Sequence, residues 1–210
     1  MTVQPGRDCP LCPRLAAFRA AERETNPSWH NAPVPSFGAL DARLLIVGLA
    51  PGLKGANRTG RPFTGDYAGV LLYGTLKKFG FATGEYAERA DDGLRLVDCR
   101  ITNAVRCVPP QNKPETDEIR TCGAFLATEL AAMPGLRIVV ALGQIAHQAT
   151  LAALKQKRSQ FPFAHGAFHI LPGGPALADS YHCSRYNTNT RVLTTEMFEN
   201  VFAAVKRRLA

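Results

Sequence analysis

Short apolar runs alternate along the chain with longer segments whose apolar residues recur at helical spacing. The clearest run is Arg137–Gly143, and a second covers Arg43–Gly48. A run of this length that stops at a glycine is typical of a strand buried on both faces. Strand character also marks residues 94–105, 168–171 and 176–182. Together these runs predict the strands of one sheet.

Longer segments with apolar residues three and four positions apart predict the helices. They cover about 13–24, 66–79, 116–133, 144–157 and 194–209. Strand and helix alternate, which is typical of a parallel sheet with helices on both faces. We therefore predict an α/β fold, a three-layer α/β/α sandwich around a central, mostly parallel sheet of about four strands.

Three polar, glycine-rich segments follow predicted strands, at residues 48–66, 103–107 and 181–190. In parallel sheets, ligands bind beyond the carboxyl ends of the strands. Because these ends share one edge of the sheet, the three segments predict a single site.

The chain has 210 residues, 46% of them hydrophobic, which is the size and apolar content of one domain. It contains no repeat, low-complexity tract or linker, and we predict a single domain over 1–210. Residues 1–42 are irregular and rich in proline, and are predicted to form an arm laid on that domain. No apolar run approaches the roughly 20 residues of a membrane helix, and the N-terminus does not resemble a signal peptide. We expect a cytoplasmic protein without membrane contact.

Basic residues exceed acidic ones, with 25 Lys and Arg against 17 Asp and Glu, which gives a formal net charge of +8. This excess favours a polyanionic partner, most simply nucleic acid, and so association with the nucleoid. Several cations flank the predicted site, namely Lys54, Arg58 and Arg61 in the first segment and Arg185 and Arg191 in the last. Most surface charges are simply solvated, but these are candidates for phosphate contacts.

Six cysteines in a cytoplasmic chain of this size are more consistent with metal or redox chemistry than with disulfides. Cys9-x2-Cys12 and Cys107-x14-Cys122 supply two pairs of thiolates, a set that suits Zn²⁺ or an iron–sulfur cluster. The alternative is that Cys107 and Cys122 are small buried apolar residues. The polar loop around Cys107 argues against that alternative. Cys99, in a strand-like segment, is predicted to pack in the core.

Five short motifs follow one another along the chain. They are C-x2-C, G-L-A-P-G from Gly48, G-R-P-F-T-G-D ending at Asp66, I-T-N-A-V-R-C ending at Cys107, and Y-H-C-S-R-Y-N-T-N-T from Tyr181. Their joint occurrence over nearly the whole chain resembles the iron–sulfur uracil-DNA glycosylases, in particular the family 5 (type b) branch. In family 4 the first motif resembles G-E-A-P-G, with a functional acid where this chain has Leu49.

The chain departs from the family pattern at two places. His182-Cys183-Ser184 stands where the family usually reads His-Pro-Ser, and a glycine is missing before Arg191. Because proline restricts the backbone, its loss is expected to loosen the loop that orients His182. The sequence leaves the role of Cys183 open.

The resemblance implies a DNA repair enzyme that flips uracil out of DNA and hydrolyses its N-glycosidic bond, leaving an abasic site. It implies that Phe63 stacks on the base and that His182 donates a hydrogen bond to its O2. Asn103 carries a donor and an acceptor for the N3–H and O4 of uracil. The first motif, Gly48-Leu49-Ala50-Pro51-Gly52, would line the same pocket. As isolated residues, Phe63 fits a core position, Asn103 the end of a strand, and His182 a structural role.

Asp66 is the best remaining carboxylate, because Leu49 and Ala50 replace the side chains that activate water in related families. The resemblance places a functional aspartate at Asp66, which would orient the water or stabilise the cationic sugar. The alternative is that Asp66 caps the helix that follows it. One residue can serve both purposes.

The DNA-binding candidates are Arg58, Arg61, Ser184, Arg185 and Tyr186. Ser184 suits a phosphate contact, and Arg185 or Tyr186 suits the wedge that fills the vacated place in the stack. The expected partner is double-stranded DNA containing deaminated bases, with single-stranded DNA as a second form. We expect the chain to bind it as a monomer.

The resemblance also implies a structural [4Fe–4S] cluster held by Cys9, Cys12, Cys107 and Cys122. It implies action on hypoxanthine and xanthine besides uracil. Two alternatives stay open. One is a family 4-like enzyme strict for uracil, against which Leu49 argues; the other is a non-catalytic nucleic-acid-binding module with a Cys₄ zinc site.

Overall fold

The computed structural model describes residues 4–210, which fold around a five-stranded sheet of order β4-β1-β5-β7-β6. Its strands are β1 (Leu44–Gly48), β4 (Cys99–Asn103), β5 (Ile138–Leu142), β6 (Phe168–His169) and β7 (Ala176–Ser180). Four of them run parallel, and β6 pairs antiparallel with β7. The predicted α/β class with a mostly parallel sheet is confirmed. The sheet has five strands where about four were expected, and the strand-like run at 168–171 forms its short antiparallel edge.

Seven α-helices and several smaller elements complete the described part of the chain. The α-helices are α1 (Pro13–Thr25), α2 (Ala56–Thr59), α3 (Tyr67–Lys78), α4 (Thr116–Ala131), α5 (Gln144–Ala153), α6 (Arg185–Asn189) and α7 (Thr195–Leu209). The smaller elements are the 3-10 turns η1 (Pro110–Asn112) and η2 (Arg158–Gln160) and a ladder of β2 (Ala82–Thr83) with β3 (Arg95–Leu96). None of the helices within residues 4–210 has the length and apolar character that a bilayer crossing requires.

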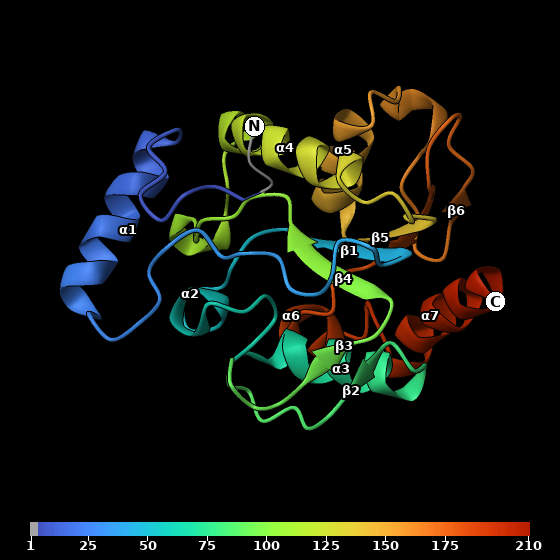
Figure 1. The fold of residues 1–210 in the computed structure, drawn as a ribbon, viewed down its shortest axis with the longest axis horizontal. Helices are drawn as coiled ribbons and strands as arrows, with labels where there is room; N and C mark the ends of the chain where they lie inside the picture. The colour runs from blue at the N-terminus through green and yellow to red at the C-terminus, as the bar shows by residue number, and fades with distance from the viewer. Residues whose placement is uncertain (1–3) are drawn as a thin grey trace.

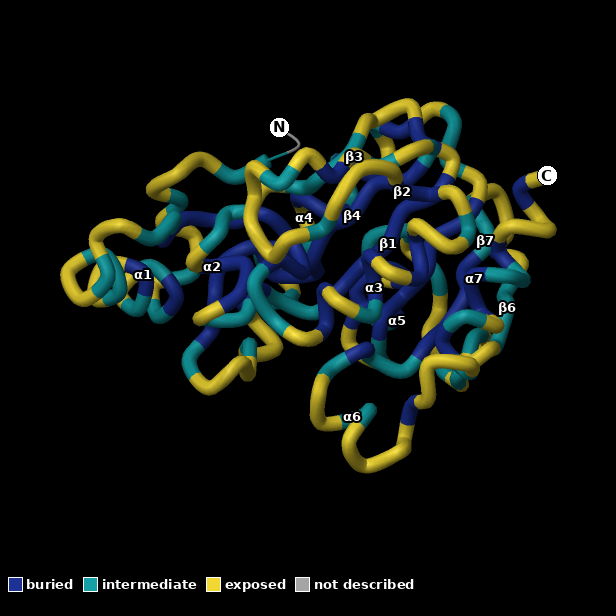
Figure 2. Tube along the Cα trace, turned by 90° about the horizontal axis from the view of Figure 1, so that it is seen from below, coloured by how far each residue is buried: buried dark blue, intermediate teal, exposed yellow. Residues whose placement is uncertain are grey.

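Helices cover both faces of the sheet, which explains why its inner strands are apolar throughout. Every residue of β1 is buried. Leu44 and Ile46 pack in the cluster that α3 and α7 complete, whereas Leu45 and Val47 pack in the cluster of α4 and α5. Figure 1 shows α4 and α5 on one side of the sheet and α3 and α7 on the other. The buried stretches of Figure 2 follow the strands and the inner sides of these helices.

The parallel strands end together at one edge of the sheet. The register pairs Gly48 with Asn103, and Leu142 with Ser180. The loops that follow Gly48, Asn103 and Ser180 therefore start side by side. This edge carries the candidate site.

Candidate active site

A recess opens at the carboxyl edge of the sheet. The structure brings together there residues from all three polar segments. Those that line the recess are Ala50, Pro51, Gly52, Ala56, Phe63, Asp66, Ala68, Asn103 and His182. Leu49 is not among them; its carbonyl accepts the backbone N–H of Val105 at 3.0 Å, which holds the first motif beside the end of β4.

Gly48 shapes the recess because it has no side chain. A Cβ at this position would collide with Oδ1 of Asn103 and would lie 2.6 Å from Cζ of Phe63. Real Cβ atoms do not come so close to a neighbour, so Asn103 and Phe63 can approach the end of β1 only over a glycine. Asn103 is 3% exposed and Phe63 7% exposed. Both are thus held at the base of the recess and not at its rim.

Phe63 has a left-handed backbone, with φ at +52°, which is a strained conformation for an aromatic residue. Two tyrosines hold it there. The hydroxyl of Tyr86 donates to the Phe63 carbonyl at 3.1 Å, and that of Tyr73 donates to the Pro62 carbonyl at 2.6 Å. The Phe63 ring then faces His182, with ring centroids 5.9 Å apart and planes 27° apart. An aromatic face fixed in this way is suited to stacking on a planar ligand.

Asp66 has two separate environments for its two carboxylate oxygens. Oδ1 accepts the backbone N–H of Gly69 at 3.3 Å and so caps α3. Oδ2 faces the glycine-rich loop, because a Cβ on Gly52 would lie 3.2 Å from it and one on Gly55 would collide with it. Burial raises the pKa of this carboxyl, although the N–H groups of Gly69 and Ala68 act in the opposite direction. The capping role and an oxygen directed at the recess coexist.

His182 is anchored through its backbone. The side-chain amide of Asn187 donates to the His182 carbonyl at 2.9 Å, and the His182 side chain lies beside Gly143, where an added Cβ would make an ordinary van der Waals contact at 3.6 Å. Burial lowers the pKa of His182 to about 4. The imidazole is therefore neutral near pH 7 and has one N–H available as a donor.

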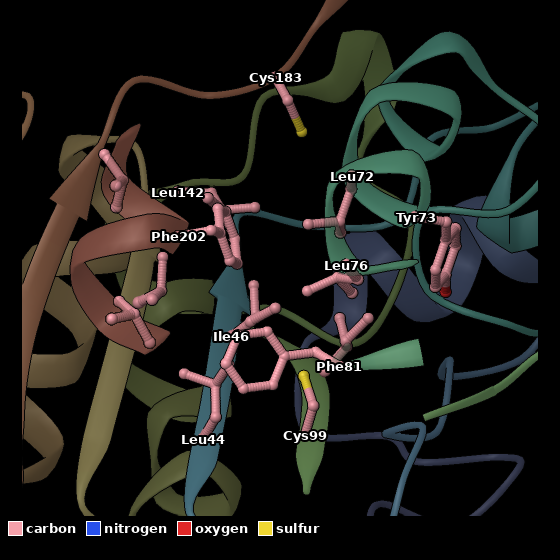
Figure 3. Close-up of a cluster of buried hydrophobic side chains, with 14 of the residues drawn as sticks. Leu44, Ile46, Leu72, Tyr73, Leu76, Phe81, Cys99, Leu142, Cys183 and Phe202 are labelled. Atoms are coloured by element: carbon pink, nitrogen blue, oxygen red, sulfur yellow. The ribbon is translucent and has the colours of Figure 1, made fainter. Parts of the chain in front are cut away.

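Cys183 belongs to the core. It is 0% exposed, its thiol lies 3.5 Å from the Ala68 carbonyl, and its sulfur points into the apolar cluster near Leu72 and Leu142 (Figure 3). Core packing of Cys183 and the amide of Asn187 anchor the segment around His182 without a proline.

Four of the DNA-binding candidates lie near the recess. Arg58, Arg185 and Tyr186 are exposed, Tyr186 at 74%. The guanidinium of Arg185 lies over the ring of Tyr67 at 5.5 Å, and Ser184 uses its hydroxyl to cap α6. Figure 2 shows the α6 segment projecting from the body.

Arg61 differs from these four residues, because its side chain is buried and paired within the protein. Its side chain is 5% exposed, and its two terminal nitrogens donate to Asp92 at 2.8 and 2.7 Å. Its Nε donates to Thr64 at 2.8 Å, and its guanidinium lies between 5.2 and 5.8 Å from the ring centroids of Phe37, Tyr73 and Tyr86. A buried, bidentate and stacked arginine of this kind stabilises the Phe63 turn from inside the protein.

The cysteine residues Cys9, Cys12, Cys107 and Cys122 line one cavity. Two of their sulfur atoms accept N–H donors: the Arg106 backbone reaches Cys122 and the Arg19 guanidinium reaches Cys107, both at 3.3 Å. The cavity lies between the N-terminal arm and α4. Cys99 lies elsewhere, in the main core.

A buried His–Asp–His group behind β7 has no counterpart in the sequence-based expectations. Asp179, 0% exposed, lies 2.7 Å from Nδ1 of His147 and 2.9 Å from Nε2 of His169. Nε2 of His147 also lies 2.9 Å from the Phe161 carbonyl. These contacts connect α5, β6 and β7 three residues before His182. The signal that could have revealed the group is an aspartate within an otherwise apolar strand, since such a residue needs buried partners.

The comparisons with known proteins agree with this geometry. The family model of the uracil DNA glycosylase superfamily matches residues 35–206, so the chain belongs to that superfamily of α/β proteins.

Within it, the chain is a member of the type-5 branch. It is 47% identical to the type-5 uracil-DNA glycosylase of Thermus thermophilus, over 98% of this chain and 95% of the relative. It is 39% identical to that of Pyrobaculum aerophilum, over 97% and 88%. The type-4 enzyme of Sulfurisphaera tokodaii is 30% identical over 80% and 72%.

Proposed function

We propose that this protein is a monofunctional DNA glycosylase that removes uracil, and also the deaminated purines hypoxanthine and xanthine, from DNA. The single observation that carries the proposal is the recess where Phe63, Asp66, Asn103 and His182 meet. Membership of a superfamily whose type-5 relatives are named uracil-DNA glycosylases supports it.

Each of these side chains has a part in base excision. The fixed face of Phe63 stacks on the flipped base. The amide of Asn103 pairs with its N3–H and O4, and a base without this pattern leaves buried polar atoms of Asn103 unpaired. The neutral imidazole of His182 donates to O2, where negative charge develops as the base leaves.

Asp66 acts on the sugar side of the reaction. Oδ2 is free of the helix cap, and Asp66 lines the recess together with Gly52, so an attacking water in the recess would lie beside the carboxylate. The carboxylate accepts a proton from this water as the water attacks C1′, and its charge stabilises the electron-poor sugar.

Acceptance of purines is supported by the lining of the recess. Ala50, Gly52, Ala56 and Ala68 contribute small side chains or none. Family 4 resembles G-E-A-P-G in this motif, with an acid at the position of Leu49. Leucine at this position adds no charge near the recess. A larger, two-ring base meets little steric opposition from such a lining.

The test uses labelled duplexes that carry uracil, hypoxanthine, xanthine or no lesion, followed by alkali to cut abasic sites. We expect scission at the three lesions only. Asp66→Asn is expected to slow single-turnover excision by about 10²- to 10⁴-fold, while the fold persists because asparagine also caps helices well. Asp91→Asn, at an exposed ion pair with Arg89, is the matched control. No scission of any lesion would refute the glycosylase proposal, and full activity of Asp66→Asn would refute the role of Asp66.

We further propose that Cys9, Cys12, Cys107 and Cys122 hold a structural [4Fe–4S] cluster. The chemistry of the donors fits, since all four thiols line one cavity with N–H donors at two of them. When bound, the cluster would cross-link the N-terminal arm to α4.

Visible absorption and determination of iron and sulfide on the purified protein test this assignment. We expect a brown protein with about four irons per chain. A colourless protein that contains zinc and no iron would refute the cluster.

A further inference from the structure

Arg19 on α1 is a buried arginine that the proposed active site does not involve. It is 4% exposed and lines the cysteine cavity. Its Nη1 donates to Sγ of Cys107 at 3.3 Å, and its Nη2 donates to the Cys9 carbonyl at 2.9 Å. Nε is buried without a hydrogen-bond partner among residues 4–210. One guanidinium therefore contacts both cysteine pairs and keeps one donor in reserve.

A buried arginine normally has a carboxylate partner, and Arg19 has none within 4.0 Å in the described part of the chain. An unpaired buried cation is unfavourable. The second arginine of the cavity differs, because the guanidinium of Arg106 is bound to Glu129 at 2.5 Å and only its backbone N–H reaches a sulfur. The negative charge that compensates the Arg19 guanidinium is therefore expected in the cysteine cavity that Arg19 lines.

We propose that Arg19 is the counter-cation and hydrogen-bond donor of the cysteine-bound centre, and that it sets the reduction potential of that centre and slows its loss of iron. This inference rests on the proposed cluster. Four thiolates around a [4Fe–4S]²⁺ core carry a net charge of −2, which the guanidinium partly offsets. Cations and N–H donors at the sulfurs favour the more reduced state, in which this charge is more negative.

The test compares purified, iron-loaded wild type with Arg19→Met and Arg19→Lys. Two quantities are measured, the midpoint potential of the centre by voltammetry and the rate at which a ferrous chelator removes its iron. We expect Arg19→Met to lower the midpoint potential and to lose iron roughly 10- to 100-fold faster, as other outer contacts of metal ligands do. Arg19→Lys keeps the charge but not the fork of donors, and should lie between the two.

Arg23→Met is the matched control. Arg23 lies one turn further along α1 and holds the arm through Asp8 and the Asn31 carbonyl, with no contact to a sulfur. If Arg19 merely anchored the arm, both methionine variants would lose iron faster at an unchanged potential, and that result would overturn the inference. If Arg19→Met does not fold, a wild-type potential in Arg19→Lys overturns it. Wild-type protein without iron would instead refute the cluster itself.

Discussion

The shape of the recess depends on the absence of a side chain at Gly48. Gly48→Ala places a methyl against Asn103 and Phe63, so one of these side chains must leave its position. We expect excision of uracil to fall by at least about 100-fold, because displacement of a positioning group by about 1 Å has costs of this size. Single-turnover kinetics beside urea unfolding measure the effect.

Gly74→Ala is its control, since a Cβ at Gly74 meets nothing within 4 Å. This substitution lies inside α3 and should stabilise the protein by about 0.5–1 kcal/mol, with excision unchanged. Equal activities in the two variants would contradict the close approach at Gly48.

The ionisable groups of the recess set the direction of its pH dependence. Burial raises the pKa of Asp66 and lowers that of His182 to about 4. The carboxylate form of Asp66 is lost as the pH falls through its raised pKa, so the excision rate should fall on the acid side. His182 stays neutral above about pH 4, so the rate should show no inflection near the ordinary histidine pKa of about 6.5. An inflection there that disappears in His182→Gln would contradict this assignment.

At the scale of elements, the end of β7 depends on Asp179. Asp179→Asn weakens its contacts with His147, which is buried on α5, and with His169, which is 12% exposed on β6. We expect a loss of about 2–4 kcal/mol in the free energy of unfolding, because groups paired in the interior are left without their partner. Urea unfolding at pH 7 measures it. Asp91→Asn, at the exposed Arg89 pair, should leave stability unchanged; an equal loss in both variants would contradict the role of the buried group.

The elements with strong periodic patterns were predictable from the sequence. The runs at Leu44–Gly48 and Ile138–Leu142 are apolar throughout because both faces are covered, and α3, α4, α5 and α7 lie within a few residues of their predicted bounds. The four residues of α2 and the five of α6 are too short to show a period. Tertiary contacts, and not local pattern, determine these elements.

The same limit applied to the candidate site. The alternation of strands and helices predicted that the three polar segments meet at one edge of the sheet. It did not predict which side chains distant in sequence bind one another. The sequence around Arg61 is typical of a loop that faces DNA. Its partner Asp92, which accepts hydrogen bonds from both terminal nitrogens, lies 31 positions later and could not be identified from the sequence. Arg19, 88 positions from Cys107, has no distinguishing sequence signal either.

At the scale of the whole molecule, the net charge of +8 predicts DNA binding that weakens with salt. Arg58 is exposed in the loop beside the recess. Arg58→Ala should reduce the slope of log Kd against log salt by about 1, because one phosphate contact is lost.

Arg207→Ala is the control for the charge alone. Arg207 is exposed near the end of α7, where the Leu209 carbonyl accepts a hydrogen bond from Arg43 beside the start of β1. This is the opposite edge of the sheet from the recess. Fluorescence anisotropy over a series of salt concentrations compares the variants, and an equal change in slope for both would indicate that DNA binding is not localised at the recess.

The cavity shared by Cys9, Cys12, Cys107 and Cys122 also constrains the order of events during synthesis. If one cofactor uses all four thiols, the first pair leaves the ribosome more than 90 residues before the second pair is complete. During that interval β5 and β7, at the centre of the sheet, have not been made. The nascent chain must keep its first two thiols reduced and unoccupied until α4 emerges. If the proposed cluster is that cofactor, iron would enter late in the formation of this protein.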